Sequence, residues 1–172
     1  MWWSSKPDPG LSRGAQYFAL AIFLSACGFQ LRGDPLVGIK ALYVSTAGAA
    51  GVATDIRRSL VSGPTRVVTS LKDAEAQLRI LGEIRDKQVY TITGTGRVYE
   101  FELRLTVRYE MTVPGRELAV IPPTEAVARR VITYSETAPI AKEAEEQLLF
   151  KDMQLELANR ILRQVAIARR DM

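Results

Sequence analysis

The chain has 172 residues and a formal net charge of +4, with a single cysteine and no histidine. One cysteine excludes an internal disulfide, and without histidine a Ser-His-Asp triad, a Cys-His pair and the usual zinc sites are excluded as well. The basic residues are interspersed with acidic ones instead of being gathered on one helix or arm, which argues against a nucleic-acid partner.

A short leader precedes the cysteine. Lys6 and Arg13 give it a modest positive charge, and residues 17–24 form an apolar run that is too short to span a bilayer, which takes about 20 apolar residues. Small residues follow the run, as they do before the cleavage site of a secretory signal peptide. Residues 24–27 (Leu-Ser-Ala-Cys) resemble a bacterial lipobox, in which a peptidase cuts before the cysteine and the cysteine is acylated.

The lipobox resemblance predicts how the chain is divided and attached. We expect residues 1–26 to be a cleaved signal peptide, residues 27–35 a lipidated linker and residues 36–172 a single domain. Several acyl chains on Cys27 would give stable membrane anchoring. Residue 28 is glycine and not the aspartate that commonly retains lipoproteins in the inner membrane, so the expected location is the periplasmic face of the outer membrane. The alternative is a buried N-terminal helix with a free cysteine.

The first part of the domain predicts a βαβ unit. Residues 36–45 include a compact, β-forming stretch that is apolar on both faces, as in a strand inside a covered sheet. Residues 52–61 predict an amphipathic helix, because an apolar side chain recurs at every fourth position. Residues 66–69 are a candidate short strand, which would complete the unit.

The next strand is interrupted by charge. Residues 76–84 alternate with a period of two, which predicts a strand with Leu78, Ile80 and Ile84 on one face. Residues 89–92 are its candidate continuation beyond a charged interruption at 85–87.

The clearest strand follows a glycine-rich hairpin tip at residues 93–96. Residues 99–113 place an apolar side chain at every second position and a charged or threonine side chain between, which predicts one face on a core and one in water. Residues 114–116 (Pro-Gly-Arg) form a turn, because proline presets φ and glycine admits the left-handed conformation.

The last elements are a returning strand and a long helix. Residues 118–121 and 127–134 predict the strand, with Pro122-Pro123 marking a bulge or a break at a sheet edge. Residues 139–170 predict the helix. One apolar stripe of this helix is expected to be core, formed by Ala144, Leu148, Leu155, Ala158, Leu162 and Val165.

Together these elements predict an α+β fold. The expected architecture is a two-layer sandwich in which a mixed sheet of about four strands carries two helices on one face, in the order β-α-β-β-β-α. The long helix would pack on the apolar face of the strand at residues 99–113. A coiled-coil partner for this helix is the alternative.

Few residues suggest catalysis. The glycine-rich residues 93–96 precede a strand and not a helix, so they lack the context of a dinucleotide-binding loop. Glu100, Glu102 and Glu110 share a strand face with arginines, which favours an ion-paired surface over an acid/base pair. We therefore expect no enzyme, no metal and no cofactor.

Two basic residues are candidates for an anion-binding site. Lys142 lies near the start of the long helix, where a positive charge meets the unfavourable end of the helix macrodipole. Arg97 leads from the glycine-rich tip into the long strand. The two could meet an anion at the same end of the sheet if the hairpin and the helix start converge. Otherwise each is an ordinary surface charge.

Three motifs are similar to those of a known family. Residues 27–33 (Cys-Gly-Phe-Gln-Leu-Arg-Gly) combine the lipobox cysteine with glycine, an aromatic residue and Leu-Arg. A long strand ending at Pro-Gly-Arg, residues 114–116, and a last helix with Ile-Ala-Lys-Glu-Ala-Glu-Glu-Gln at residues 140–147 are also similar. On these motifs the chain resembles the LptE family of lipopolysaccharide-assembly lipoproteins over nearly the whole mature sequence.

This resemblance implies a binding protein. LptE proteins lie in the lumen of the outer-membrane β-barrel LptD, help it to assemble and bind lipopolysaccharide on its way to the outer leaflet. The resemblance implies lipopolysaccharide contact by Lys142 and, at a displaced position in the hairpin, by Arg97. The implied partners are an LptD-like barrel, lipopolysaccharide and the membrane through acylated Cys27.

Two other functions remain open on the sequence. One is an auxiliary lipoprotein of an ABC-type lipid-transport system, tethered in the same way but without the barrel partner. The other is a histidine-free periplasmic hydrolase, against which the absence of an activated nucleophile argues.

Overall fold

The computed structural model describes residues 39–134 and 139–172. The elements are β1 (Ala41–Thr46), α2 (Gly51–Val61), β2 (Arg66–Val68), β3 (Ala76–Ile92), β4 (Val98–Thr112), β5 (Ile121–Thr133) and α3 (Pro139–Ala168), with 3-10 turns at Leu71–Asp73 and Arg169–Asp171. The expected leader, Cys27, the linker and residues 36–38 of the first predicted strand lie outside the described residues.

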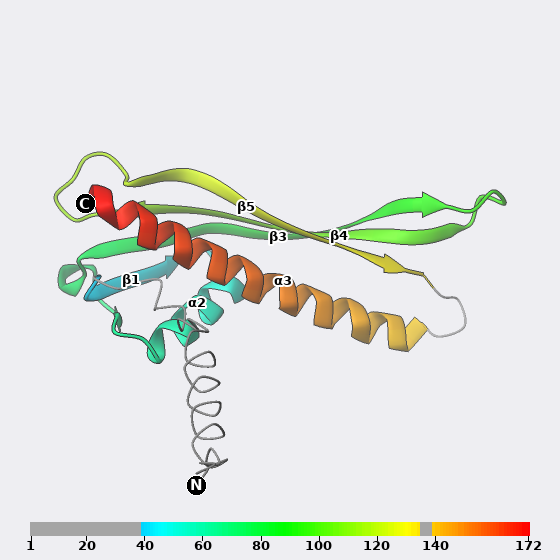
Figure 1. Ribbon diagram of the computed structural model, residues 1–172, viewed down its shortest axis with the longest axis horizontal. Coiled ribbons are helices and arrows are strands. Elements are labelled where there is room, and N and C mark those ends of the chain that lie inside the picture. The colour runs from blue at the N-terminus through cyan, green and yellow to red at the C-terminus, as the bar shows by residue number, and fades with distance from the viewer. Residues whose placement is uncertain (1–38, 135–138) are drawn as a thin grey trace, which may run out of the picture. The chain divides into compact units, whose positions relative to one another are not determined.

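The strands form one mixed sheet in the order β2-β1-β3-β4-β5, and α2 and α3 cover the same face of it (Figure 1). β1 is parallel to β2 and β3, whereas β3, β4 and β5 pair antiparallel. The predicted α+β sandwich is confirmed. The sheet has five strands instead of about four, because Arg66–Val68 pairs with β1 and forms a short edge strand of its own.

The core lies between the helices and the covered face of the sheet. In α2 the predicted stripe of Val52, Ile56 and Leu60 is buried. In β4 the predicted alternation places five consecutive odd-numbered side chains in the core, namely Leu103, Leu105, Val107, Tyr109 and Met111. The opposite face of β4 carries ion pairs, as expected, including those of Arg104 with Glu102 and of Arg79 with Glu110.

An irregularity in β3 exchanges the two faces of the strand. Its register with β4 shifts between Ile80 and Gly82, so that β3 accommodates one extra residue. Before the shift Leu78 and Ile80 are buried in the core, and after it Glu83 is directed toward the helices. Ile84 is 61% exposed, so its predicted place beside Leu78 and Ile80 is wrong. Strict alternation holds only where no bulge interrupts it.

Glu83 connects β3 to both helices. One carboxylate oxygen accepts a hydrogen bond from the Val52 N–H (3.0 Å) in the first turn of α2, where the N-cap residue Ala50 provides no side-chain cap. The other accepts one from Nε2 of Gln154 in α3 (2.8 Å), and Arg85 lies 3.5 Å away. The Glu83 side chain is 6% exposed, and these donors from three elements compensate the burial of its charge.

The buried stripe of α3 is rotated from the predicted one. Its members are Phe150, Met153, Gln154, Leu157, Ala158, Ile161, Leu162 and Val165. Ala158, Leu162 and Val165 are core as predicted, but Leu148 and Leu155 are 68% and 40% exposed. The stripe around Phe150 contains larger side chains than the predicted stripe. The observed rotation of α3 about its axis therefore buries more apolar area than the predicted rotation would.

β5 contains the proline pair of the sequence. Pro122-Pro123 lie within this edge strand, and the register with β4 is irregular beside them, which confirms the predicted bulge. Of the predicted segment 118–121, only Ile121 belongs to the strand. Leu118 lies in the exposed loop between β4 and β5.

Arginine side chains tie the edge of β5 to α3. Arg160 of α3 donates a hydrogen bond to the carbonyl oxygen of Val127 (2.9 Å). Arg130 of β5 reaches Asp152 (3.0 Å) and Glu156 (2.7 Å) of α3. The hydrogen bond to Glu156 is the largest cause of a raised pKa of Arg130, and the hydrogen bond to Asp152 is the next largest. The backbone of an edge strand is otherwise free to pair with another chain.

Candidate ligand-binding site

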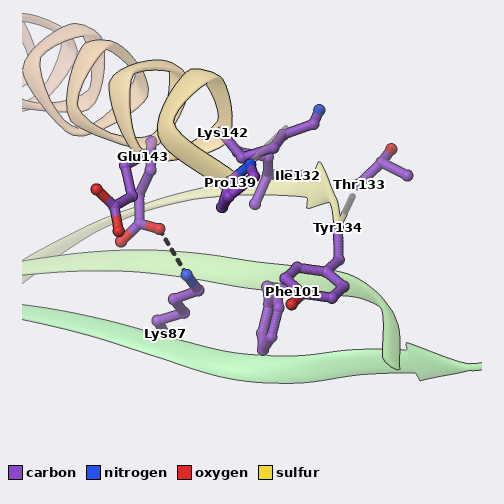
Figure 2. A pocket seen from close by; sticks show the side chains of 9 residues that line it. Lys87, Phe101, Ile132, Thr133, Tyr134, Pro139, Lys142 and Glu143 are labelled. Atoms are coloured by element: carbon purple, nitrogen blue, oxygen red, sulfur yellow. Dashed lines mark hydrogen bonds and ion pairs between the residues drawn. The ribbon is translucent and has the colours of Figure 1, made fainter. Parts of the chain in front are cut away.

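A pocket of about 220 Å³ opens where the first turns of α3 pass the strands (Figure 2). It is lined by Lys87, Phe101, Ile132, Thr133, Tyr134, Pro139, Lys142, Glu143 and Glu146. A neighbouring hollow shares Lys87, Glu143 and Glu146 and adds Ile140, Ala144 and Gln147. The site therefore combines charges of both signs with aromatic and aliphatic side chains.

Lys87 belongs to the pocket because of the bulge in β3. The charged residues 85–87, expected to interrupt the strand, continue it, and Lys87 lies opposite Leu103 on the covered face. Its Nζ is 2.6 Å from Oε2 of Glu146 in α3 and 4.6 Å from the centre of the Phe101 ring. The ammonium group is thus held between a carboxylate and an aromatic face.

The aromatic wall comes from the ends of two paired strands. The rings of Phe101 and Tyr134 meet edge to face, with centroids 5.7 Å apart and an interplanar angle of 86°. The Tyr134 N–H donates to the carbonyl oxygen of Tyr99 (2.8 Å), which holds the residue after β5 against β4. This arrangement gives the pocket a fixed apolar side.

Lys142 lines the pocket from the end of the first turn of α3. Its Nζ pairs with Oε2 of Glu145 (2.8 Å), one turn further along the helix. Figure 2 shows the Lys142 side chain extending away from Lys87, toward the outside of the pocket. The aliphatic stem of Lys142 therefore forms part of the wall, and its charge lies at the rim.

Arg97 lies in the turn between β3 and β4. The Thr93 N–H donates to the Arg97 carbonyl oxygen (2.7 Å), the Arg97 N–H donates to Oγ1 of Thr93 (3.1 Å), and Gly96 has φ +80°. The predicted hairpin is confirmed. Arg97 is at the same end of the sheet as the pocket, since Glu100 pairs with Thr133, but the pocket lining does not include it. Its role in ligand contact stays a prediction.

One exposed aliphatic side chain borders the charged groups. Ile140, which lines the neighbouring hollow, is 82% exposed although it is a large aliphatic residue. Within the described ranges, no helix combines the length and apolarity needed to cross a membrane.

The site suits an amphiphilic anion. Lysine ammonium groups form charge-assisted hydrogen bonds with phosphate oxygens, and the exposed Ile140 offers contact to hydrocarbon.

Across the part of the chain that the structure describes, no cluster of three or more acidic, cysteine or histidine side chains could hold a metal ion.

Sequence reasoning identified Lys142 but not Lys87. In an unbroken strand Lys87 would lie on the face opposite Leu78 and Ile80, with the solvated charges. The signal that could have found it is Gly82, because an isolated glycine inside a strand pattern suggests a bulge. A bulge at that position moves the side chains that follow it to the other face, here up to the next register shift after Val89.

The fold is that of bacterial lipoproteins of known structure. An uncharacterized lipoprotein B from Nitrosomonas europaea matches with a TM-score of 0.71 and 28% identity, over 81% of this chain and 90% of that protein. The rare lipoprotein B from Shewanella oneidensis matches with a TM-score of 0.68 and 26% identity, over 77% of this chain and 98% of that one.

The sequence matches the family LptE, described as lipopolysaccharide-assembly, over residues 39–165, and the chain belongs to this family. Proteins named LPS-assembly lipoprotein LptE from Yersinia pestis and Yersinia pseudotuberculosis are 29% identical over 151 residues, covering 85% of this chain and 72% of theirs. The family predicted from the sequence motifs is confirmed. The role named in the family description is lipopolysaccharide assembly.

Proposed function

We propose that this chain is an outer-membrane lipoprotein that lies inside an LptD-like β-barrel, helps the barrel to assemble and binds lipopolysaccharide on its way to the outer leaflet. Membership of the LptE family supports the proposal. In it, acylated Cys27 attaches the protein to the periplasmic face of the outer membrane, after removal of residues 1–26.

The chemistry of the pocket carries the lipid-binding part of the proposal. Lipopolysaccharide joins anionic phosphates to acyl chains, and the site at the start of α3 joins lysine ammonium groups to the exposed Ile140. We assign Lys142 to phosphate contact at the pocket rim. Arg97 is assigned to a second contact from the hairpin tip, at the same end of the sheet.

The partner is tested by gentle detergent extraction of outer membranes that contain a C-terminally tagged copy of the chain. A large β-barrel protein recovered in stoichiometric amount is the expected result. Recovery of an inner-membrane transporter component instead, or of no partner, would contradict the barrel assignment and favour an auxiliary transport lipoprotein.

The lipid-binding role is tested with Lys142→Glu. The variant should bind purified lipopolysaccharide roughly tenfold more weakly, because it replaces a charged hydrogen-bond donor with an anion. Its Tm should stay close to that of the wild type, since the ion pair of Lys142 with Glu145 lies at the surface.

Lys151→Glu is the matched control for this experiment. Lys151 is exposed on the same helix, outside the lining of the pocket, so the same charge reversal should leave the affinity unchanged. Equal binding by Lys142→Glu and the wild type would contradict the role of Lys142. A loss of affinity in Lys151→Glu equal to that in Lys142→Glu would show that net charge, and not contact by Lys142, causes the weaker binding. Arg97→Glu tests the hairpin contact separately.

A further inference from the structure

We infer that Lys87 is a second phosphate-binding side chain of the pocket and that Glu146 is its internal competitor, a carboxylate that the lipid phosphate replaces on binding. The inference rests on the proposed function, because it takes a phosphorylated lipid as the ligand. It adds a residue and a means of control to the site.

The position of Lys87 favours contact with a ligand. It lines both the pocket and the neighbouring hollow, so a ligand that occupies either of them meets its ammonium group. The side chain is 41% exposed despite its ion pair, whereas that of Glu146 is 19% exposed. The accessible member of the pair is therefore the cation. The Phe101 ring beneath Nζ keeps the ammonium group at the pocket wall.

The charges of the pocket explain the competition. Its lining contains two lysines, Lys87 and Lys142, and two glutamates, Glu143 and Glu146, so the formal sum is +2 −2 = 0. Both ammonium groups are already paired, Lys87 with Glu146 and Lys142 with Glu145. An anion therefore enters a neutral site whose cations are occupied, and it gains full contact with Lys87 only when Glu146 moves away.

A phosphate group can make this exchange. Ion pairs between partly exposed side chains contribute little to stability, so separating Lys87 from Glu146 requires little free energy. A phosphate monoester carries up to about two negative charges and three strong acceptor oxygens, against one charge and two oxygens for the carboxylate. The exchange favours doubly charged phosphate over singly charged ligands, and exposed Ile140 favours a lipid over free phosphate.

The test measures binding of bisphosphorylated lipid A to the full-length chain in detergent. Glu146→Gln keeps the size of the side chain but removes its charge, and it should bind about threefold more tightly because Lys87 is freed. Lys87→Gln should bind roughly fivefold more weakly. In the double variant the gain from Glu146→Gln should disappear, because the competitor acts only through Lys87.

Glu143→Gln is the matched control. Glu143 lines the same pocket and loses the same charge, but the ion pair of Lys87 is with Glu146. Any gain from Glu143→Gln should therefore persist when Lys87 is also replaced. The Tm of each variant verifies its folding. Dephosphorylated lipid A should bind without a difference between wild type and Glu146→Gln, and inorganic pyrophosphate should bind much more weakly than lipid A.

The outcomes separate this inference from the proposed function. If the wild type binds lipid A but Glu146→Gln does not bind it more tightly, the competition is overturned. It is also overturned if Glu146→Gln gives the same gain in affinity when Lys87 is replaced by glutamine. If inorganic pyrophosphate binds as tightly as lipid A, the assignment to a lipid phosphate is overturned. If the wild type binds no lipid A at all, the lipid-binding part of the proposed function fails, and the inference fails with it.

Discussion

Replacing Glu83 with alanine tests the connection between β3 and the two helices. The variant removes the acceptor for the Val52 N–H, a loss comparable to that of an N-cap, about 1 kcal/mol. It also leaves the amide of Gln154, a residue 7% exposed, without the Glu83 acceptor, which adds about 1–3 kcal/mol. Relief from burying a charge offsets part of this sum. We expect a net loss of about 2 kcal/mol in the free energy of unfolding.

The assay is urea unfolding together with amide hydrogen exchange. For a domain of this size the expected loss corresponds to a Tm decrease of roughly 5–10 °C. The Val52 N–H should also exchange faster relative to other amides of the core, because a general loss of stability would accelerate exchange at all of them. Glu125→Ala is the matched control, because the Glu125 side chain is exposed on β5, and it should change stability by less than about 0.5 kcal/mol. A Glu83→Ala variant as stable as this control would refute the reasoning.

Three further predictions concern buried or edge positions. Gly51→Ala would place a Cβ against the amide of Gln154, so it should lower stability by about 1 kcal/mol although alanine is the better helix former. In a Gln154→Ala background the same change should be neutral or stabilising in urea unfolding. Equal losses of stability in both backgrounds would contradict the clash. Burial raises the pKa of Tyr109 above 10.0, and the charge of Arg160 opposes this shift. The buried neutral hydroxyl therefore contributes stability below about pH 10, and this contribution is lost as the pH rises through the folded-state pKa. Tyr109→Phe should therefore flatten the fall in Tm above pH 10, and parallel curves for the variant and wild type would refute this. Arg160→Gln should free the edge carbonyl of Val127 and give a concentration-dependent dimer in sedimentation, whereas a strictly monomeric variant would show that the edge is protected in another way.

The elements with an uninterrupted period could be predicted from the sequence. β4 alternates without a break, so its pattern identified both the strand and the face that packs in the core. The spacing in α2 likewise identified the buried residues Val52, Ile56 and Leu60. In each case the local pattern and the tertiary packing agree, and for that reason one sequence was sufficient.

The orientation of α3 and of the second half of β3 could not be predicted in this way. α3 has apolar residues on more than one side, and packing against the sheet selected the side with Phe150 over the side with Leu148. In β3 one extra residue near Gly82 reversed the faces of residues 83–89, up to the next register shift. Lys142 was recognised from its position at the start of the predicted helix and from a linear motif, whereas Lys87 enters the pocket only through this reversal.

The edges of the sheet determine how another protein could pair with this domain. On one side the sheet begins with β2, which has only three residues, and on the other it ends with β5, where prolines and the contact from Arg160 reduce the backbone available for pairing. The pairing of β3 with β1 ends at Ile80, so among the described residues no strand pairs with that side of β3 from residue 81 to residue 92. Another protein that continued this sheet by backbone pairing would therefore do so along β3 beyond Ile80, and it would contact the edges at β2 and β5 through side chains.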